Sequence, residues 1–258
     1  MGVDRSSKEA VWKHAKRIEG KTLGGISNEA RSLDGVPFKK VKGKVGKIVE
    51  EYFTAKMGSR SLPDLPEIGW EIKTCPLKPD GKTVDQPVTL NMFDYCREIS
   101  ACKGTGEHKK CNEIKKSSLY KKGKEILFVF YVRDKKNKPA SEWRIKHVYR
   151  WKMDSKTTKL LSPDYDIIVS RLRNSNGLYC KQIVGDKVKK CIDPENCKTN
   201  LHQEQNKYLT TCPKHQGGFQ YEKNSNNSRI QPFSAKRAES RAFRLKKEYM
   251  QKIVDGLS

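Results

Sequence analysis

The sequence predicts an α/β fold built around one substantial core. Segments with the apolar spacing of amphipathic helices come before and after segments with the patterns of β-strands. The chain has 258 residues, of which 35% are hydrophobic, and the apolar residues cluster in periodic blocks. A chain of this length can bury enough apolar surface for one domain, or for two lobes that share a cleft.

Two segments near the N-terminus are expected to be helices. A capping box from Ser6 to Glu9 precedes the first segment, whose apolar face consists of Val11, Trp12, Ala15 and Ile18. The second segment has apolar residues at the i, i+3, i+4, i+7 and i+8 spacing between Val45 and Phe53. Prolines in the stretch 58–66 require this helix to end before them.

The segment from Ile68 to Thr74 alternates apolar and polar residues and is expected to be a strand. Because successive side chains of a strand point to opposite faces, Glu71 and Lys73 should project from the same face. Residues 88–92 are a candidate for the next strand.

The most apolar segment, Glu125–Arg133, is typical of a buried strand, and residues 143–151 are expected to pair with it. The apolar residues between Tyr165 and Leu172 fit a helix or a strand. Near the C-terminus, helical spacing connects Ala242, Leu245, Tyr249 and Ile253.

The charge of the chain favours a polyanionic partner. Lys and Arg number 54 against 30 Asp and Glu, which gives a net charge of +24. Residues 96–124 are polar and basic, with eight Lys and two Glu from Lys103 to Lys124, and are expected to be an exposed loop or flexible arm. Nucleic acid is the commonest partner that offsets such a surplus, because Lys and Arg release counterions from phosphates. A solvated basic face and a lysine-rich genome are the alternatives.

Membrane proteins and secreted disulfide-bonded proteins are both disfavoured. The longest unbroken apolar run, Ile126–Val132, is far shorter than a membrane span. The N-terminus lacks the apolar segment of a secretory signal. We therefore expect a cytoplasmic protein whose eight Cys are thiols or metal ligands rather than disulfides.

Asp64, Glu71 and Lys73 carry the main indication of chemistry. Hydrolysis of a phosphodiester needs a metal that neutralises developing charge and a polarised water opposite the leaving oxygen. Two carboxylates from adjacent segments suit a hard cation such as Mg²⁺. A lysine on the same strand face can sit beside the attacking water. The alternative is a surface ion pair on a strand, because loose spacings of this kind also arise by chance.

Three stretches carry a resemblance to a known family. In chain order they are Gly43-Lys-Val-Gly46-x3-Glu50, Pro63-Asp64-Leu-Pro-Glu-Ile-Gly69-Trp-Glu71-Ile-Lys73-Thr74-x-Pro76 and Arg241-Ala-Phe243-Arg-Leu245-Lys-Lys-x-Tyr249. Together they resemble the MutH-like branch of the PD-(D/E)xK nucleases. That branch holds a mismatch-repair nicking enzyme and GATC-cutting type II restriction endonucleases of the Sau type, which this chain resembles most. The resemblance covers most of residues 7–174 and 219–255.

The resemblance implies roles for the acidic residues and the lysine after them. Asp64 and Glu71 would be metal ligands, and Lys73 would orient the attacking water. Glu50 would assist at the metal or in its water shell.

Further positions follow from the same resemblance. Lys122 resembles the additional active-site lysine of the family, although Lys121 and Lys124 compete for that position. The residues implied to contact DNA are Lys223, Asn226, Arg241 and Arg244. Arg244 stands where MutH-type enzymes carry a tyrosine thought to sense adenine methylation, so the resemblance does not extend to that property.

Residues 176–218 contain Cys and His residues outside the stretch that the resemblance covers. The candidate zinc ligands are Cys180, Cys191, Cys197, Cys212 and His215. Four ligands from this set could close a structural Zn²⁺ site and give the segment a reason to fold. Free thiols in a basic insertion are the alternative, because paired C-x2-C motifs are missing.

The activity implied is a Mg²⁺-dependent, sequence-specific cleavage of double-stranded DNA, of type II restriction character, expected at GATC and leaving 5′-phosphate ends. The larger GATC enzymes of this group carry a second, catalytically silent domain, for which this chain is too short. A homodimer on DNA is therefore expected, because a palindromic site suits two-fold symmetry. A MutH-like mismatch-repair nicking enzyme and a non-catalytic DNA-binding module are the alternatives.

The fold implied is restriction-endonuclease-like, with a mixed central sheet flanked by helices and two lobes around a DNA cleft. A single nuclease domain would contain mainly the catalytic lobe in residues 1–175 and the insertion in residues 176–218. Residues 219–258 would form the DNA-recognition and C-terminal segment.

Overall fold

In a computed structural model, the chain forms two compact units. The residues that it describes are 4–36, 41, 43–53, 62–92, 98, 114–134, 136–174, 181–184, 187–190, 206–213 and 241–257. Unit 1 consists of residues 1–88, 122–153 and 247–258, and unit 2 consists of residues 89–121 and 154–246.

Helices and strands alternate along much of the chain. The helices are α1 (Lys8–Lys16), α2 (Leu23–Ile26), α4 (Lys44–Tyr52), α6 (Ser118–Gly123), α7 (Ser155–Asn174) and α8 (Lys247–Asp255), and the 3-10 helices are η1 (Asn28–Leu33), η2 (Ile114–Lys116) and η3 (Ala140–Glu142). The strands are β1 (Trp70–Leu77), β2 (Val88–Met92), β3 (Glu125–Val132), β4 (Ile145–Lys152), β5 (Lys181–Val184), β6 (Lys187–Lys190), β7 (Leu209–Pro213) and β8 (Arg241–Leu245).

The sheet of unit 1 has the strand order β1-β3-β4. Strand β1 runs parallel to β3, with Trp70 opposite Glu125 and Leu77 opposite Val132. Strand β4 runs antiparallel to β3, so the predicted pairing of these two strands is confirmed. The sheet is therefore mixed, as expected, and β1 lies at its edge.

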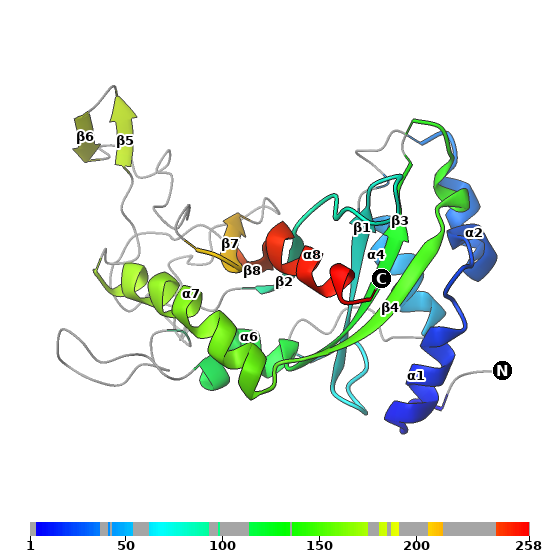
Figure 1. The fold of residues 1–258 in the computed structure, drawn as a ribbon, viewed down its shortest axis with the longest axis horizontal. Helices are drawn as coiled ribbons and strands as arrows, with labels where there is room; N and C mark the ends of the chain where they lie inside the picture. Colours follow the sequence, from blue (N-terminus) through cyan, green and yellow to red (C-terminus); the bar gives the residue numbers. More distant parts are fainter. Residues whose placement is uncertain are drawn as a thin grey trace, which may run out of the picture. The chain divides into compact units, whose positions relative to one another are not determined.

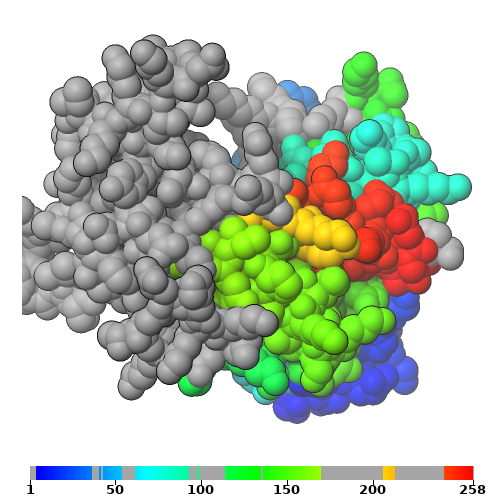
Figure 2. All heavy atoms as spheres, turned by 60° about the vertical axis from the view of Figure 1, so that its left-hand side comes forward, coloured from blue at the N-terminus to red at the C-terminus, as the bar shows by residue number. Residues whose placement is uncertain are grey.

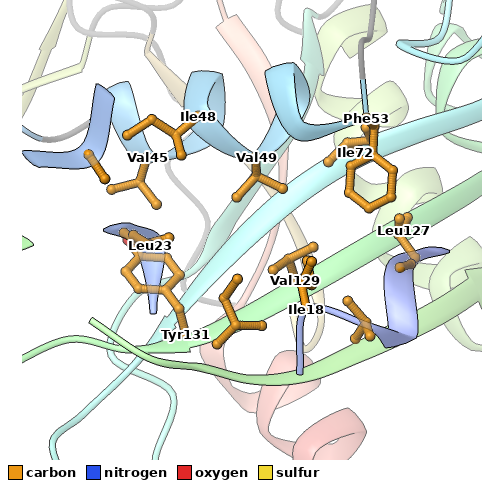
Figure 3. Close-up of a cluster of buried hydrophobic side chains, with 14 of the residues drawn as sticks. Ile18, Leu23, Val45, Ile48, Val49, Phe53, Ile72, Leu127, Val129 and Tyr131 are labelled. Carbon is orange, nitrogen blue, oxygen red and sulfur yellow. The ribbon is translucent and has the colours of Figure 1, made fainter. Parts of the chain in front are cut away.

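One face of this sheet forms the main apolar core of unit 1 with the helices that pack on it. Figure 3 shows the apolar side chains of α4 directed at the strands. Those of the α4 segment are Val45, Ile48, Val49 and Phe53, and those of β1 and β3 include Ile72, Leu127, Val129 and Tyr131. All of them are at most 5% exposed. Each such burial stabilises the fold by roughly 1.5–3 kcal/mol.

Helix α8 covers the opposite face of the same sheet (Figure 1). The indole Nε1 of Trp151 on β4 donates to the hydroxyl of Tyr249 on α8 at 2.8 Å, and both side chains are buried. The amide N–H of Val84 donates to the side chain of Gln251 at 2.8 Å. The C-terminal helix is thus tied to the strands that precede it by more than 90 residues.

Two element boundaries in unit 1 differ from the expected ones. Ser7 caps α1, because its Oγ accepts the N–H of Ala10 at 3.2 Å, so the capping box expected from Ser6 was wrong by one residue. Strand β1 begins at Trp70 rather than Ile68, because a tight turn occupies the residues just before it.

Unit 2 contains a second sheet with the order β2-β8-β7 and a separate antiparallel pair, β5-β6. Helix α7 lies beside β7, as Figure 2 shows for the yellow-green helix and the yellow strand. The buried carboxylate of Asp164 on α7 fixes this contact. It accepts the N–H groups of Lys207, Tyr208 and Leu209 at distances of 2.6–2.8 Å.

Two expectations fail in unit 2. Ala242 and Leu245 belong to strand β8 and not to a helix, since the helix begins only at Lys247. Part of the Lys-rich stretch is not an exposed loop, because residues 114–123 contain η2 and α6 with Ile114 and Leu119 fully buried. The segment of undecided type around Tyr165 is part of helix α7.

Among the described residues, no helix combines the length and the apolar character needed to cross a membrane. The expected boundaries after residues 175 and 218 fall outside the described residues and stay predictions.

Candidate active site

A tight turn at the start of β1 holds the first of the acidic residues. The backbone of Leu65 pairs with that of Trp70 through N–H to O=C bonds of 2.9 and 3.1 Å. Gly69 closes the turn with a φ of 71°, in the left-handed region that favours glycine. The N–H of Ile72 then donates to Oδ2 of Asp64 at 2.8 Å. The turn thereby fixes the carboxylate of Asp64 against the first residues of β1.

Glu71 is the centre of the charged cluster. Its side chain is 3% exposed, and its Oε1 lies 2.5 Å from Nζ of Lys73 and 3.3 Å from Nζ of Lys122. Its other oxygen, Oε2, is buried and has no hydrogen-bond partner among the described residues. Glu71 and Lys73 therefore share a face of β1 as predicted. The alternative of an exposed surface ion pair is wrong, because Glu71 is buried.

Glu50 approaches the same cluster from α4. Burial raises the pKa of Glu50, and the nearby charge of Asp64 raises it further. The charge of Glu71 acts in the same direction, while the ammonium groups of Lys73 and Lys122 lower it. The structure thus brings all five residues of the predicted catalytic set into electrostatic contact.

The pKa of Glu71 is also raised. Burial is the largest cause, and the charge of Asp64 adds to it. The ammonium groups of Lys73 and Lys122 oppose the shift without cancelling it. Adjacent carboxylates with raised pKa values disfavour their own charge, so a cation that binds between them gains free energy by relieving that repulsion.

The residues present fit a Mg²⁺ ion by their chemistry. Carboxylate oxygens are the ligands that Mg²⁺ takes from proteins, and Oε2 of Glu71 is a buried acceptor to which no described residue donates. Within the described parts of the chain, no three His, Cys, Asp or Glu side chains already lie close enough to hold a metal ion. Binding would therefore require the carboxylate side chains of the cluster to rearrange.

The structure decides among the three lysines that competed for one position. Lys122, near the end of α6, is half-buried and reaches Glu71. The side chains of Lys121 and Lys124 are exposed. Lys122 is therefore the lysine that the fold brings to the cluster.

A backbone group that no sequence motif indicates also contributes to the site. The amide N–H of Ile72 orients Asp64 by a hydrogen bond. No side-chain pattern could have revealed it, because every residue except proline carries this donor.

The positions implied for DNA and zinc are only partly described. Arg241 is fully buried, and its Nε donates to Oγ1 of Thr211 at 2.9 Å. Arg244 is half-buried, and its Nε lies 3.4 Å from Oγ1 of Thr89.

Cys212 is buried on β7 as a free thiol. The remaining candidates lie outside the described residues: Lys223, Asn226, Cys180, Cys191, Cys197 and His215. Their roles stay predictions.

Comparisons with known proteins agree with the geometry. Residues 53–164 match the family model described as "DNA mismatch repair enzyme MutH", a segment that includes Asp64, Glu71, Lys73 and Lys122. Over 254 residues, or 96% of the chain, the sequence is 28% identical to the type II restriction enzyme Sau3AI of Staphylococcus aureus.

Shorter matches connect the chain with mismatch-repair proteins. It is 34% identical over 80 residues to the DNA mismatch repair proteins MutH of Yersinia pestis (strain Pestoides F) and Yersinia pseudotuberculosis (serotype O:1b), a match that covers 31% of this chain. The chain spans 42% of the length of the restriction enzyme, and the shorter match spans 35% of each MutH protein. The resemblance to MutH-like nucleases of the Sau type is confirmed, and with it the restriction-endonuclease-like α/β class of the fold.

Proposed function

We propose that this chain is a Mg²⁺-dependent endonuclease that hydrolyses phosphodiester bonds of duplex DNA at a specific site, with type II restriction character. The observation that carries the proposal is the convergence at the β1 edge of three carboxylates and two ammonium groups: Glu50, Asp64, Glu71, Lys73 and Lys122. Burying so many charges together is costly for stability alone. A site that binds a metal ion and a phosphodiester substrate explains why these charges lie together.

Asp64 and Glu71 would hold the Mg²⁺, with Glu50 at the metal or in its water shell. When bound, Mg²⁺ neutralises charge at the scissile phosphate and lowers the pKa of a bound water. The amide of Ile72 keeps Asp64 oriented, and the unpartnered Oε2 of Glu71 supplies a second acceptor. The chain therefore carries one acceptor on Asp64, before the turn, and one on Glu71, after it.

The two lysines would stabilise the negative charge of the phosphate. Nζ of Lys73 donates to Oε1 of Glu71 at 2.5 Å and to the carbonyl of Ile72 at 3.1 Å. An ammonium group has three N–H bonds, so one remains to orient a water or to donate to a phosphate oxygen. Lys122 adds a second cation from α6, and cations placed where charge develops lower the barrier to reaction.

Charge and the comparisons support duplex DNA as the substrate. A net charge of +24 favours double-stranded DNA, and binding should weaken sharply as salt rises. Similarity to a type II restriction enzyme over 96% of the chain supports site-specific cutting. We take GATC as the site, 5′-phosphate and 3′-hydroxyl groups as the ends, a homodimer on DNA as the active form and the cytoplasm as the location.

A MutH-like nicking activity is the second candidate. The family match over residues 53–164 favours it, because it covers most of the candidate site. A repair nickase cuts one strand and needs activation by a partner. The large positive charge instead favours a chain that binds DNA by itself.

A plasmid digest tests the proposal. Plasmids with methylated or unmethylated GATC sites are incubated with Mg²⁺ and with wild type, Asp64→Ala or Asp80→Ala. Asp80 is the matched control, because it is an exposed aspartate in another turn of unit 1. We expect discrete double-strand fragments ending at GATC from wild type and Asp80→Ala, and none from Asp64→Ala.

The other outcomes are equally informative. Nicked circles alone would favour the repair-type activity. Tight DNA binding without any cleavage would overturn the proposal and favour a non-catalytic DNA-binding module.

A further inference from the structure

A second buried carboxylate, Glu125, lies beside the candidate active site at the start of β3. Its side chain is 8% exposed and accepts hydrogen bonds from three different elements. Lys8 of α1 donates to Oε1 at 2.7 Å, and the indole Nε1 of Trp70 donates to Oε2 at 2.8 Å. Arg150 of β4 donates to Oε2 at 3.3 Å, and its guanidinium lies over the Trp70 ring, 4.9 Å from the ring centre.

Trp70 connects this cluster to the acidic residues. It is fully buried and stands opposite Glu125 in the β1–β3 ladder. Its backbone pairs with Leu65, the residue that follows Asp64, and Glu71 is the next residue along β1. The orientation of Trp70 therefore affects the backbone that presents both carboxylates.

We propose that Glu125 is a positioning residue which, through Trp70, holds the turn that presents Asp64 and Glu71 to a divalent cation. This inference rests on the proposed function. Glu125 does not touch the reacting groups. It acts through the hydrogen bond to the indole.

Stability alone is a weak explanation for a carboxylate at this position. The rest of β3, Ile126–Val132, is entirely apolar. A buried ion pair contributes little more to stability than well-packed apolar side chains of the same volume. A carboxylate that binds an indole N–H, an ammonium and a guanidinium instead fixes one orientation of each of them.

The opposite end of the same ladder offers a matched control. Arg133 follows β3, is buried, and forms an ion pair with Asp85. Its N–H donates to the carbonyl of Leu77, the last residue of β1, at 3.0 Å. Asp85→Asn therefore weakens the ion pair of a buried arginine at the end of the β1–β3 ladder, far along β1 from Asp64 and Glu71.

The experiment measures metal binding, stability and cleavage separately. Mn²⁺ binding to the DNA-free protein is followed by calorimetry, folding by thermal unfolding, and single-turnover cleavage as a function of Mg²⁺ concentration. Glu125→Leu and Trp70→Phe should each weaken Mn²⁺ binding by about 10-fold, with a matching rise in the Mg²⁺ needed for half-maximal cleavage. Glu125→Gln keeps an acceptor for the indole and should retain most of the affinity. Asp85→Asn should lose stability and bind Mn²⁺ like wild type.

A double variant and the controls decide the outcome. Glu125→Leu combined with Trp70→Phe should be no weaker than either single variant, because both break the same hydrogen bond. Wild-type Mn²⁺ binding by Trp70→Phe and Glu125→Leu, or an equal loss in Asp85→Asn, would overturn the inference while leaving the proposed function intact. A wild-type protein that neither binds Mn²⁺ nor cuts DNA would overturn the proposed function itself.

Discussion

Glu71 and Glu125 are buried carboxylates that lie one position apart in the ladder of β1 and β3, on opposite faces of the sheet. Burial raises the pKa of Glu125, but the hydrogen bonds from Lys8, Trp70 and Arg150 outweigh it, and the pKa lies below its usual value. Burial raises the pKa of Glu71 as well, and there the two lysines do not outweigh it.

The difference shows that burial alone does not decide whether a carboxylate can bind a new ligand. Both oxygens of Glu125 accept hydrogen bonds, so it can fix geometry but has little capacity for a new ligand. In Glu71, both ammonium groups contact Oε1, and Oε2 has no partner in the part of the chain that the structure describes. A buried acceptor without a donor gains most from a cation.

The largest effect is expected on the Glu71 face. Lys73→Ala should lower the cleavage rate by about 10³-fold, because it removes a cation placed where charge develops. DNA binding, measured with Ca²⁺ in place of Mg²⁺, should stay unchanged. Lys152→Ala, an exposed lysine at the end of β4, is the control and should cut normally. If Lys73→Ala cuts at the wild-type rate, the assigned active site is wrong.

Two adjacent lysines of α6, Lys121 and Lys122, test whether contact with Glu71 matters for cleavage. Lys122→Ala should lower the single-turnover rate by about 10²-fold, since it removes the second ammonium from Glu71. Lys121→Ala should leave the rate unchanged, because that side chain is exposed. Equal losses in the two variants would mean that general positive charge, and not the contact with Glu71, matters on this helix.

A substitution at Gly69 can strain the turn between Leu65 and Trp70 without removing any charge. Gly69 and Gly20 have φ angles of 71° and 81°, and an added Cβ meets nothing within 4 Å at either position. Gly69→Ala and Gly20→Ala should therefore each lower the free energy of unfolding by about 1 kcal/mol. Only Gly69→Ala should also slow cleavage, by about 10-fold, because it shifts the backbone that positions Asp64. Parallel stability and cleavage losses in both variants would contradict this role of the turn.

The smallest effect is expected on the Glu125 face and depends on pH. A carboxyl with a lowered pKa in the folded state contributes stability above its unfolded pKa, about 4.3 for Glu, and loses it as pH falls through the folded pKa. The melting temperature of Glu125→Gln should therefore lie below that of wild type at pH 7, and the gap should narrow below about pH 4. Thermal melts between pH 3 and 7 measure this gap. A gap that stays constant over that range would show that the charge of Glu125 does not stabilise the fold.

Local patterns predicted those parts of the fold that depend on neighbouring residues. The apolar spacing of Val45–Phe53 identified α4, and the alternation around Glu71 placed Lys73 on the same face. The apolar run from Glu125 identified β3 as a buried strand. Helical spacing failed at Ala242 and Leu245, because apolar residues three apart also occur in a strand that is buried on both faces.

The sequence by itself determined the fold class, the family resemblance and the set Glu50, Asp64, Glu71 and Lys73, because these depend on local periodicity and on short motifs. Only the tertiary structure selected Lys122 among its neighbours and buried Arg241. The hydrogen bond between Trp70 and Glu125, which are 55 residues apart in the sequence, also comes from the tertiary structure. These outcomes depend on which distant segments pair and in what register, and strand pairing between distant segments leaves no periodic pattern in either segment.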